Sequence, residues 1–562
     1  MLKFNTVNKR TLPEILNSSY KKFADRPALN FVGSTESSYG DFYEKVNALS
    51  VYLKKSGISK NDKVAIFSAN MPNWAIVQFA VTMIGAVYVP ILPGFSQEEI
   101  KNILTHSEVK TIFVSDMLYK HIADIKTPFL SERILINNMA KIPEDFPYQN
   151  LKELKNDICL EACHHIPFAE IEEEDTASII YTSGTTGFSK GVELSHRNLV
   201  WNALQCRTIY DVKPEDRFLS ILPMAHTYEN TLGLLLPLIC GSSIYYLDKA
   251  PSPGVLIPAM KKIRPTAMLS VPMVIEKIYK STIVPKINAN KVTKFLHGYN
   301  FTRKFIHKMA GKKLIQSFGG AISFFGIGGA KLDSEVERFL KEARFPYAVG
   351  YGLTETAPMV AGSSPAETYL NTIGPLMKGV DVKIHAPKKS GEGEIWIKSP
   401  SVMKGYYKQP ELTKEVITRD GWFKTGDLGC FDKKGRLQIK GRKKTMILGA
   451  SGENIYPEEI ESIINTFRFV SESLVMEYKG KLVAMVYFNI EELEKHLTNF
   501  KNQASSYIED LKKELREYVN SKVNNFSKLQ MVVEKSEPFE KTPTYKIKRF
   551  LYNNNPYLIV KK

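Results

Sequence analysis

The stretch Tyr181–Gly191, which reads YTSGTTGFSKG, decides how the rest of this 562-residue chain folds around it. The apolar run Ala177–Ile180 before it is typical of a buried strand, and extended-looking sequence resumes at Val192–Leu194. The stretch is therefore predicted to be a loop between two strands. Its glycines let backbone N–H groups turn toward an anion, its hydroxyls donate hydrogen bonds, and its lysine adds positive charge. The residues suited in this way to the phosphates of a nucleotide are Thr182, Ser183, Gly184, Thr185, Thr186, Gly187 and Lys190.

An ordinary P-loop is excluded by the spacing within this loop. That motif requires G-x-x-x-x-G-K-[ST] between a strand and a helix. Counted from Gly184, the second glycine position is occupied by Ser189, and the residue after Lys190 is Gly191, so the pattern fails twice. Taken alone, the loop could also be a flexible turn rich in Gly, Ser and Thr.

Further downstream, apolar strands end in polar or glycine-rich turns. Phe324–Leu332 (FFGIGGAKL) places Gly328, Gly329 and Ala330 at the carboxyl end of a strand, where open α/β sheets bind ligands. The strand Tyr347–Val349 leads into Gly350–Thr356, GYGLTET. An aromatic ring such as Tyr351 suits a purine, and a carboxylate such as Glu355 suits a hard cation.

Three more segments complete the set of motifs. Pro223–Glu229 (PMAHTYE) contains His226, which on its own would be interpreted as a packing residue. Asp427 approaches a strand, where one carboxylate can accept two hydrogen bonds, and Gly441–Lys444 follows. The tail Lys541–Arg549 reads KTPTYKIKR, a lysine-rich composition that is usually only solvated.

In order and spacing, these motifs resemble those of the AMP-forming adenylating superfamily, which includes acyl-CoA synthetases, peptide-synthetase adenylation domains and firefly luciferase. The resemblance covers about Thr11 to Tyr552. It implies that His226 lies near the carboxylate substrate and that Gly328-Gly329-Ala330 abuts adenine and the acyl group. By the same resemblance, Tyr351 and Gly352 border adenine, Thr354 bonds the α-phosphate, and Glu355 holds Mg²⁺, with Thr185 as a second candidate ligand. Asp427 and Arg442 would contact ribose, Lys444 would be a hinge, and Lys546 would act on the carboxylate and α-phosphate during adenylation. Tyr545 departs from the glycine that is usual in the tail motif, and many relatives have Asp at the hinge.

The predicted fold class is α/β with two domains. Alternating helical and strand patterns between Thr11 and Asp116 favour parallel β/α construction, whereas Asp124–Glu174 is weakly patterned and is interpreted as a connection. The length exceeds what a single core supports. The resemblance implies a large N-terminal domain, residues 1–443, with two β/α sheets and a distorted β-barrel. A small mobile lid, residues 444–562, would carry the adenylation lysine.

The function implied by the resemblance is that of a long-chain fatty acid–CoA ligase using ATP, Mg²⁺ and CoA. Such an enzyme forms acyl-AMP and pyrophosphate, then transfers the acyl group to CoA. Val271–Tyr279 (VPMVIEKIY) favours long-chain synthetases over acetyl or aromatic ligases. Two alternatives stay open: a fatty acyl-AMP ligase that loads an acyl carrier protein, and a non-catalytic basic protein that binds lipid or nucleic acid on this fold. The retained Lys190, Glu355, Asp427, Arg442 and Lys546 argue against the second, and no nucleic acid is expected.

Composition is ordinary for a globular protein, with 43% hydrophobic and 24% charged residues and a net charge of +17. The scattered cysteines Cys159, Cys163, Cys206, Cys240 and Cys430 favour a reducing cytoplasm over a disulfide scaffold, and a zinc site at Cys159 and Cys163 lacks a second ligand pair. Val64–Gln97 has no charged residue, but its prolines favour a buried helix and strand over a membrane span.

A basic tract lies between Glu276 and Asp333, where no acidic residue occurs. Aromatic and aliphatic residues are interleaved with its lysines, partly at helical spacing. This composition is typical of an amphipathic segment on the anionic inner face of the membrane. A solvated basic helix packed on its own domain remains the alternative, since aromatic residues at that spacing are commonly core. The basic residues are Lys277, Lys280, Lys286, Lys291, Lys294, Arg303, Lys304, Lys308, Lys312, Lys313 and Lys331.

Overall fold

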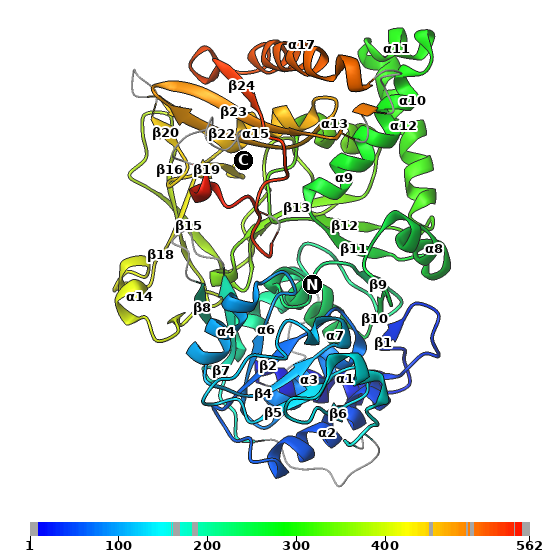
Figure 1. The fold of residues 1–562 in the computed structure, drawn as a ribbon, viewed down its shortest axis with the longest axis vertical. Coiled ribbons are helices and arrows are strands. Elements are labelled where there is room, and N and C mark those ends of the chain that lie inside the picture. Colours follow the sequence, from blue (N-terminus) through cyan, green and yellow to red (C-terminus); the bar gives the residue numbers. More distant parts are fainter. Residues whose placement is uncertain are drawn as a thin grey trace.

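The computed structural model describes residues 9–158, 160, 169–182, 189–448, 453–490, 493–494, 500–544 and 546–552. Two large sheets form the body of the protein, and the C-terminal residues form a smaller sheet beside them (Figure 1). Cys159, Cys163, Tyr545 and the loop residues Ser183, Gly184, Thr185, Thr186 and Gly187 lie outside the described residues.

The first large sheet has eight strands in the order β17-β8-β7-β3-β2-β4-β5-β6. Its centre, from β7 to β5, is parallel, and the edge strands β17, β8 and β6 pair antiparallel. Two of its strands, β5 and β6, lie in the segment that the sequence indicated only as a connection. The strands are β2 (Lys63–Phe67), β3 (Val87–Pro90), β4 (Val109–Val114), β5 (Glu132–Leu135), β6 (Ala140–Lys141), β7 (Thr176–Thr182), β8 (Lys190–Ser195) and β17 (Gly405–Tyr406).

Helices cover this sheet as the apolar patterns predict. The stretch without charge forms α3, buried from Trp74 onward, and the fully buried β3, so its interpretation as a buried helix and strand is confirmed. A short 3₁₀ helix, η1 (Tyr148–Glu153), follows β6. The helices of this part are α1 (Leu12–Phe23), α2 (Tyr39–Lys55), α3 (Pro72–Met83), α4 (Gln97–His106) and α5 (Asp116–Tyr119).

The second large sheet has seven strands in the order β1-β10-β9-β11-β12-β13-β14, parallel except for the last pair. Its parallel strands end at the junction with the first sheet, where Figure 1 shows β9, β11, β12 and β13 side by side. Ser195 caps helix α6 through a capping box, as the sequence predicts. The strands are β1 (Leu29–Phe31), β9 (Arg217–Ser220), β10 (Ser243–Tyr246), β11 (Ala267–Ser270), β12 (Phe324–Ile327), β13 (Tyr347–Gly352) and β14 (Met359–Gly362). The helices are α6 (His196–Cys206), η2 (Glu229–Leu235), α7 (Leu236–Cys240), α8 (Pro253–Ile263), α13 (Ser334–Glu342) and the turn η4 (Thr354–Thr356).

The crossover between β11 and β12 is long and helical. It contains α9 (Pro272–Ile278), η3 (Tyr279–Ile283), α10 (Val284–Asn288), α11 (Lys291–His297) and α12 (Asn300–Ser317). Leu314 packs into the core beneath, whereas Phe301 is 87% exposed. No helix among the described residues is long and apolar enough to cross a membrane.

A third sheet stands where the resemblance predicts a distorted β-barrel. Its described strands form an open antiparallel sheet in the order β15-β16-β18-β19, with α14 (Pro410–Val416) at one side. These strands are β15 (Asp381–His385), β16 (Gly393–Lys398), β18 (Phe423–Phe431) and β19 (Leu437–Arg442).

The remaining residues, 447–552, are called the C-terminal segment below. They build their own hydrophobic clusters around α15 and β23, separate from the core of the two large sheets. Figure 1 shows the end of this segment descending toward the junction of the two large sheets. Its elements are β20 (Ile447–Leu448), β21 (Asn454–Ile455), α15 (Pro457–Thr466), β22 (Val470–Tyr478), β23 (Lys481–Phe488), α17 (Phe500–Asn520), η5 (Asn525–Ser527), β24 (Met531–Glu534) and η6 (Arg549–Leu551).

Candidate active site

The two ends of the predicted phosphate loop are fixed by a strand pair. Thr182 at the end of β7 lies opposite Lys190 at the start of β8. The Lys190 Nζ atom lies 5.1 Å from the centre of the Tyr406 ring, an arrangement that favours the cation. Burial lowers the pKa of Lys190, and the positive charge of Lys444 lowers it further. Lys444, the predicted hinge, therefore lies close enough to Lys190 for the two positive charges to affect each other.

Asp427, which the resemblance assigns to ribose, is the centre of a buried hydrogen-bonded group. The residue is only 4% exposed, and the Tyr351 hydroxyl donates to its Oδ2 at 2.7 Å. The Arg442 Nε lies 3.0 Å from Oδ1, and the charge of Asp427 raises the pKa of Arg442. Since each carboxylate oxygen has two lone pairs, Asp427 can still accept hydrogen bonds from two ribose hydroxyls.

Glu355 lies after strand β13, in the turn η4, beside Thr354. The Tyr406 hydroxyl donates to Glu355 Oε1 at 3.0 Å, and burial with the charge of Glu355 raises the pKa of Tyr406. Gly352 is required here because a Cβ atom would lie 1.9 Å from the Pro358 carbonyl oxygen. The close approach holds the GYGLTET turn against the following strand.

The carboxyl end of β12 forms the other side of the site. Gly328 is buried, whereas Gly329 and Ala330 are exposed. A Cβ atom on Gly328 would lie 3.2 Å from the Tyr228 ring, and Gly329 has a φ of +86°. The absence of a side chain at Gly328 thus lets the Tyr228 ring approach the strand end closely.

His226 lies two residues before that tyrosine. Its Nδ1 accepts a hydrogen bond from the Tyr228 N–H at 3.2 Å, so Nδ1 carries no proton. Burial lowers the pKa of His226 to about 4, and the charge of Lys546 contributes in the same direction. At neutral pH the ring is uncharged, and its Nε2–H is a hydrogen-bond donor.

Glu229 is a buried acid next to this histidine turn. The Ser220 hydroxyl donates to its Oε1 at 2.6 Å, and Oε2 has no hydrogen-bond partner among the described residues. Burial raises the pKa of Glu229 to about 8. The carboxyl group is therefore protonated at neutral pH.

The tail of the C-terminal segment brings Lys546 into the site. A turn from Lys541 to Ile547 holds it, closed by the Thr542 N–H donating to the Lys546 carbonyl at 2.7 Å. Lys546 is exposed at the surface, and desolvation by the protein around it, with the charge of Arg442, lowers its pKa. The charges of Asp427 and Glu355 oppose the shift.

Gly94, in the loop between β3 and α4, leaves room for the tail turn. A Cβ atom on Gly94 would lie 3.0 Å from the Pro543 Cα, which is closer than side chains usually pack. The turn that carries Lys546 therefore rests on the loop between β3 and α4. Neither Gly94 nor Tyr406 was singled out from the sequence, because both belong to the site through contacts between distant segments.

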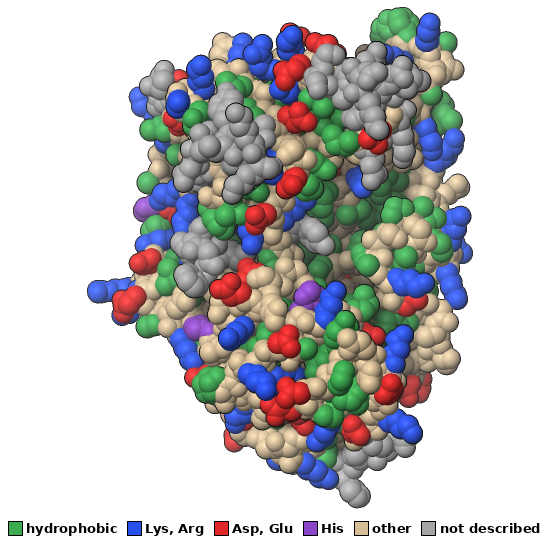
Figure 2. All heavy atoms as spheres, viewed as in Figure 1, with side chains coloured by type: hydrophobic (Ala, Val, Ile, Leu, Met, Phe, Trp, Pro, Cys, Tyr) green, Lys and Arg blue, Asp and Glu red, His purple; other side chains and the backbone are tan. Residues whose placement is uncertain are grey.

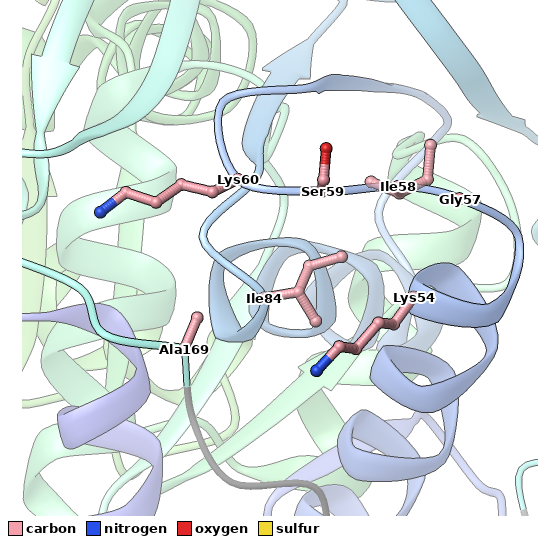
Figure 3. A pocket seen from close by; sticks show the side chains of 7 residues that line it. All are labelled: Lys54, Gly57, Ile58, Ser59, Lys60, Ile84 and Ala169. Carbon is pink, nitrogen blue, oxygen red and sulfur yellow. The ribbon is translucent and has the colours of Figure 1, made fainter.

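A hollow lies outside this group of residues, between Lys54, Lys60, Ile84 and Ala169 (Figure 3). It has a volume of about 290 Å³, and none of the residues predicted from the motifs lines it. Lys60 forms an ion pair with Asp175 at 2.7 Å. This hollow is separate from the group around Asp427.

The chain is similar in sequence and in fold to several known proteins. The long-chain-fatty-acid–CoA ligase heimdall of Drosophila melanogaster is 29% identical over 504 residues, covering 82% of this chain and 73% of that protein. A chloroplastic long-chain-fatty-acid–[acyl-carrier-protein] ligase of Arabidopsis thaliana is 29% identical over 574 residues, covering 86% and 77%. The crystal structure of ATP-bound MatB from Rhodopseudomonas palustris has the same fold, with a TM-score of 0.76, 22% identity, and coverage of 98% and 100%. The sequence profile described as AMP-binding enzyme matches residues 16–407, and the chain belongs to that family.

Proposed function

We propose that this protein is a long-chain fatty acid–CoA ligase that forms an acyl-adenylate. The fatty acid carboxylate attacks the α-phosphorus of ATP and displaces pyrophosphate, and the CoA thiol then displaces AMP from acyl-AMP. The observation that carries the proposal is the position of Lys546. Its charge acts on His226 at the acyl side, and its pKa responds to Asp427 and Glu355 at the nucleotide side.

The proposed roles follow from charge and hydrogen bonding. Lys190 and Lys546 neutralise phosphate charge that develops as pyrophosphate leaves, and preorganised donors of this kind give most of such rate enhancements. Thr354 would donate to the α-phosphate. Asp427, held by Tyr351, would accept the ribose hydroxyls. The uncharged His226 would donate to the acyl oxygen.

Mg²⁺ fits beside Glu355. The ion is commonly bound by one or two carboxylates together with substrate phosphates. Tyr406 engages one oxygen of Glu355, and the other can face a cation. Among the described residues no group of three His, Cys, Asp or Glu side chains could hold a metal alone, so phosphate oxygens would complete the shell. The ion would supply charge neutralisation on the phosphates.

CoA is the proposed acceptor, with an acyl carrier protein as the alternative. The Drosophila relative is named for CoA and the Arabidopsis relative for the carrier protein. AMP release with palmitate and MgATP, measured with CoA and with holo-carrier protein, tests both. Turnover with CoA supports the proposal, turnover with the carrier alone supports the alternative, and no AMP release with either overturns the ligase function.

The domain boundary is proposed at Lys443 and Lys444. The C-terminal segment has its own core, and Lys444 lies two residues after the end of β19, the last strand of the third sheet. Rotation about Lys444 would let the tail leave the site after adenylation, so that CoA can approach. The two units are residues 1–443 and 444–562.

Peripheral binding to an anionic membrane is proposed for the outer face of α11 and α12, called the docking face below. Its exposed apolar residues are Val292, Phe295, Leu296, Tyr299, Phe301, Phe305 and Met309, each at least 37% exposed. On α12, the row Phe301, Phe305, Met309 runs beside the exposed lysines Lys304, Lys308 and Lys312. Figure 2 shows apolar and basic side chains together at this corner of the molecule.

The inner face of α12 is structural, in agreement with part of the alternative interpretation. Arg303 pairs with Glu342 at 2.9 Å, and His307 lies 2.8 Å from the same carboxylate. The apolar row Phe301, Phe305 and Met309 faces outward and does not enter the core. Each exposed lysine near an anionic surface could contribute about 1 kcal/mol, and the apolar row would insert into the interface.

Co-sedimentation with vesicles tests the docking face. Wild type should bind anionic vesicles in low salt, and the variant with Lys304, Lys308, Lys312 and Lys313 changed to Glu should lose that binding. Phe301→Ser with Phe305→Ser should weaken it in high salt as well, because the apolar contact is not screened. Equal binding of all three proteins to anionic vesicles would overturn the proposal.

A further inference from the structure

Helix α15 of the C-terminal segment is bonded at its carboxyl end to a lysine from the crossover of the seven-stranded sheet. Lys280, in η3 of the β11–β12 crossover, donates from Nζ to the carbonyl oxygens of Asn465 at 3.1 Å and Val470 at 2.7 Å. Asn465 is in the last turn of α15, where carbonyls have no partner within the helix. A cation at this position is stabilised by the negative end of the helix dipole. Lys280 therefore acts as a cap supplied by another part of the chain.

The amino end of the same helix is held by a second lysine. Lys331, which follows the Gly328-Gly329-Ala330 turn, forms an ion pair with Glu459 at 2.7 Å. Glu459 lies in the first turn of α15, where an acidic residue is favoured by the helix dipole. Figure 1 shows α15 beside α9 and α13, above the seven-stranded sheet. Both ends of the helix are thus tied to the crossover and strand end that border the acyl side.

Helix α15 is bonded to the tail that carries Lys546. Glu461 on α15 is buried and is bonded to Arg549. Arg549 also donates to the Val475 carbonyl at 3.3 Å, and it lies three residues after Lys546. The charges of Glu461 and Glu458 raise the pKa of Arg549 although burial lowers it. A displacement of α15 would therefore displace the turn that presents Lys546.

We propose that Lys280 and Lys331 are positioning residues for the adenylation step. Together they clamp α15 end to end and hold the C-terminal segment in the orientation in which Lys546 faces the nucleotide. The inference rests on the proposed two-step function, in which the segment turns away before CoA reacts. In that second orientation neither lysine can keep its present partner, so the clamp favours only the first half-reaction.

The test measures the two half-reactions separately. In Lys280→Met, which keeps the aliphatic stem, acyl-AMP formation from palmitate and MgATP should fall about fivefold, the effect of losing one charge–dipole contact. Lys280→Met combined with Lys331→Met should fall further, by about tenfold or more. Conversion of supplied acyl-AMP to acyl-CoA should stay at the wild-type rate. Lys280→Arg retains the charge and should restore most of the first rate.

Controls separate this clamp from a general loss of stability. Lys261→Met removes an exposed lysine of α8, which Figure 1 places well away from α15, and should leave both half-reactions unchanged. Equal losses in both half-reactions, or unchanged adenylation in the double variant, would overturn the clamp. Wild type that forms no acyl-AMP would instead refute the ligase function, so the two failures are distinguishable.

Discussion

Replacing Lys546 with alanine removes the positive charge that the tail brings into the active site. In the structure this charge lies among Arg442, Asp427 and Glu355, and it also acts on His226. The tail turn keeps its contact with the rest of the protein when the side chain is truncated, because Pro543 still rests on Gly94. The variant therefore tests the lysine charge and leaves the fold of the tail turn in place.

The expected loss is worked from the geometry. Desolvation by the surrounding protein lowers the pKa of Lys546, so its charge acts on a developing phosphate charge more strongly than it would in bulk water. Loss of one preorganised donor of this kind typically costs about 2.7–4 kcal/mol, or about 10² to 10³ in rate. Lys546→Ala should therefore slow acyl-AMP formation by that factor. The second half-reaction should persist, since the tail is then turned away from the site.

Exchange of labelled pyrophosphate into ATP, dependent on palmitate, measures the first half-reaction. Release of AMP from supplied acyl-AMP with CoA measures the second. Lys548→Ala is the matched control, because it removes another lysine of the same tail two residues further on. Equal losses in both half-reactions, or a loss in Lys548→Ala as large as in Lys546→Ala, would refute the assignment.

Three further outcomes are expected. Lys444→Pro fixes φ at the proposed hinge and should slow one half-reaction far more than the other in stopped-flow assays, whereas two near-normal rates would place the hinge elsewhere. Gly94→Val should hinder closure against Pro543 and lower pyrophosphate exchange but not thioester formation; unaltered exchange contradicts the contact. Glu229 has its pKa raised from 4.5 to about 8, so the folded state binds the extra proton and stability falls as pH rises through that window. Glu229→Gln should remove this fall, by up to about 1.4 kcal/mol per pH unit in denaturant titrations, and parallel curves for both proteins would contradict it.

Much of the fold could be predicted because its signals are local. The Ser195 capping box, the uncharged stretch that became α3 and β3, and the apolar strand before the phosphate loop each follow from short sequence patterns. The secondary structure of the segment from Asp124 to Glu174 is harder to predict from the sequence. Its strands β5 and β6 are four and two residues long, too short for a periodic pattern to be recognised.

The partners within the site could not be read from local patterns. Tyr406 reaches Glu355 because β17 pairs with β8, more than 200 positions earlier in the chain. Tyr351 was expected to pack on adenine, and the structure adds that its hydroxyl fixes Asp427. Such contacts depend on how distant strands meet, which neither composition nor spacing specifies.

The state of His226 follows from combining both halves of the site. Burial is the larger cause of its low pKa, and the charge of Lys546 is the smaller. With the tail in place both causes act in the same direction, so the imidazole is uncharged at neutral pH. Its Nδ1 is occupied by the Tyr228 N–H, which leaves Nε2–H as a donor. Under the proposed function, His226 would therefore offer this Nε2–H to the acyl oxygen, and an acid limb of the rate near pH 6.5 would have to come from another group.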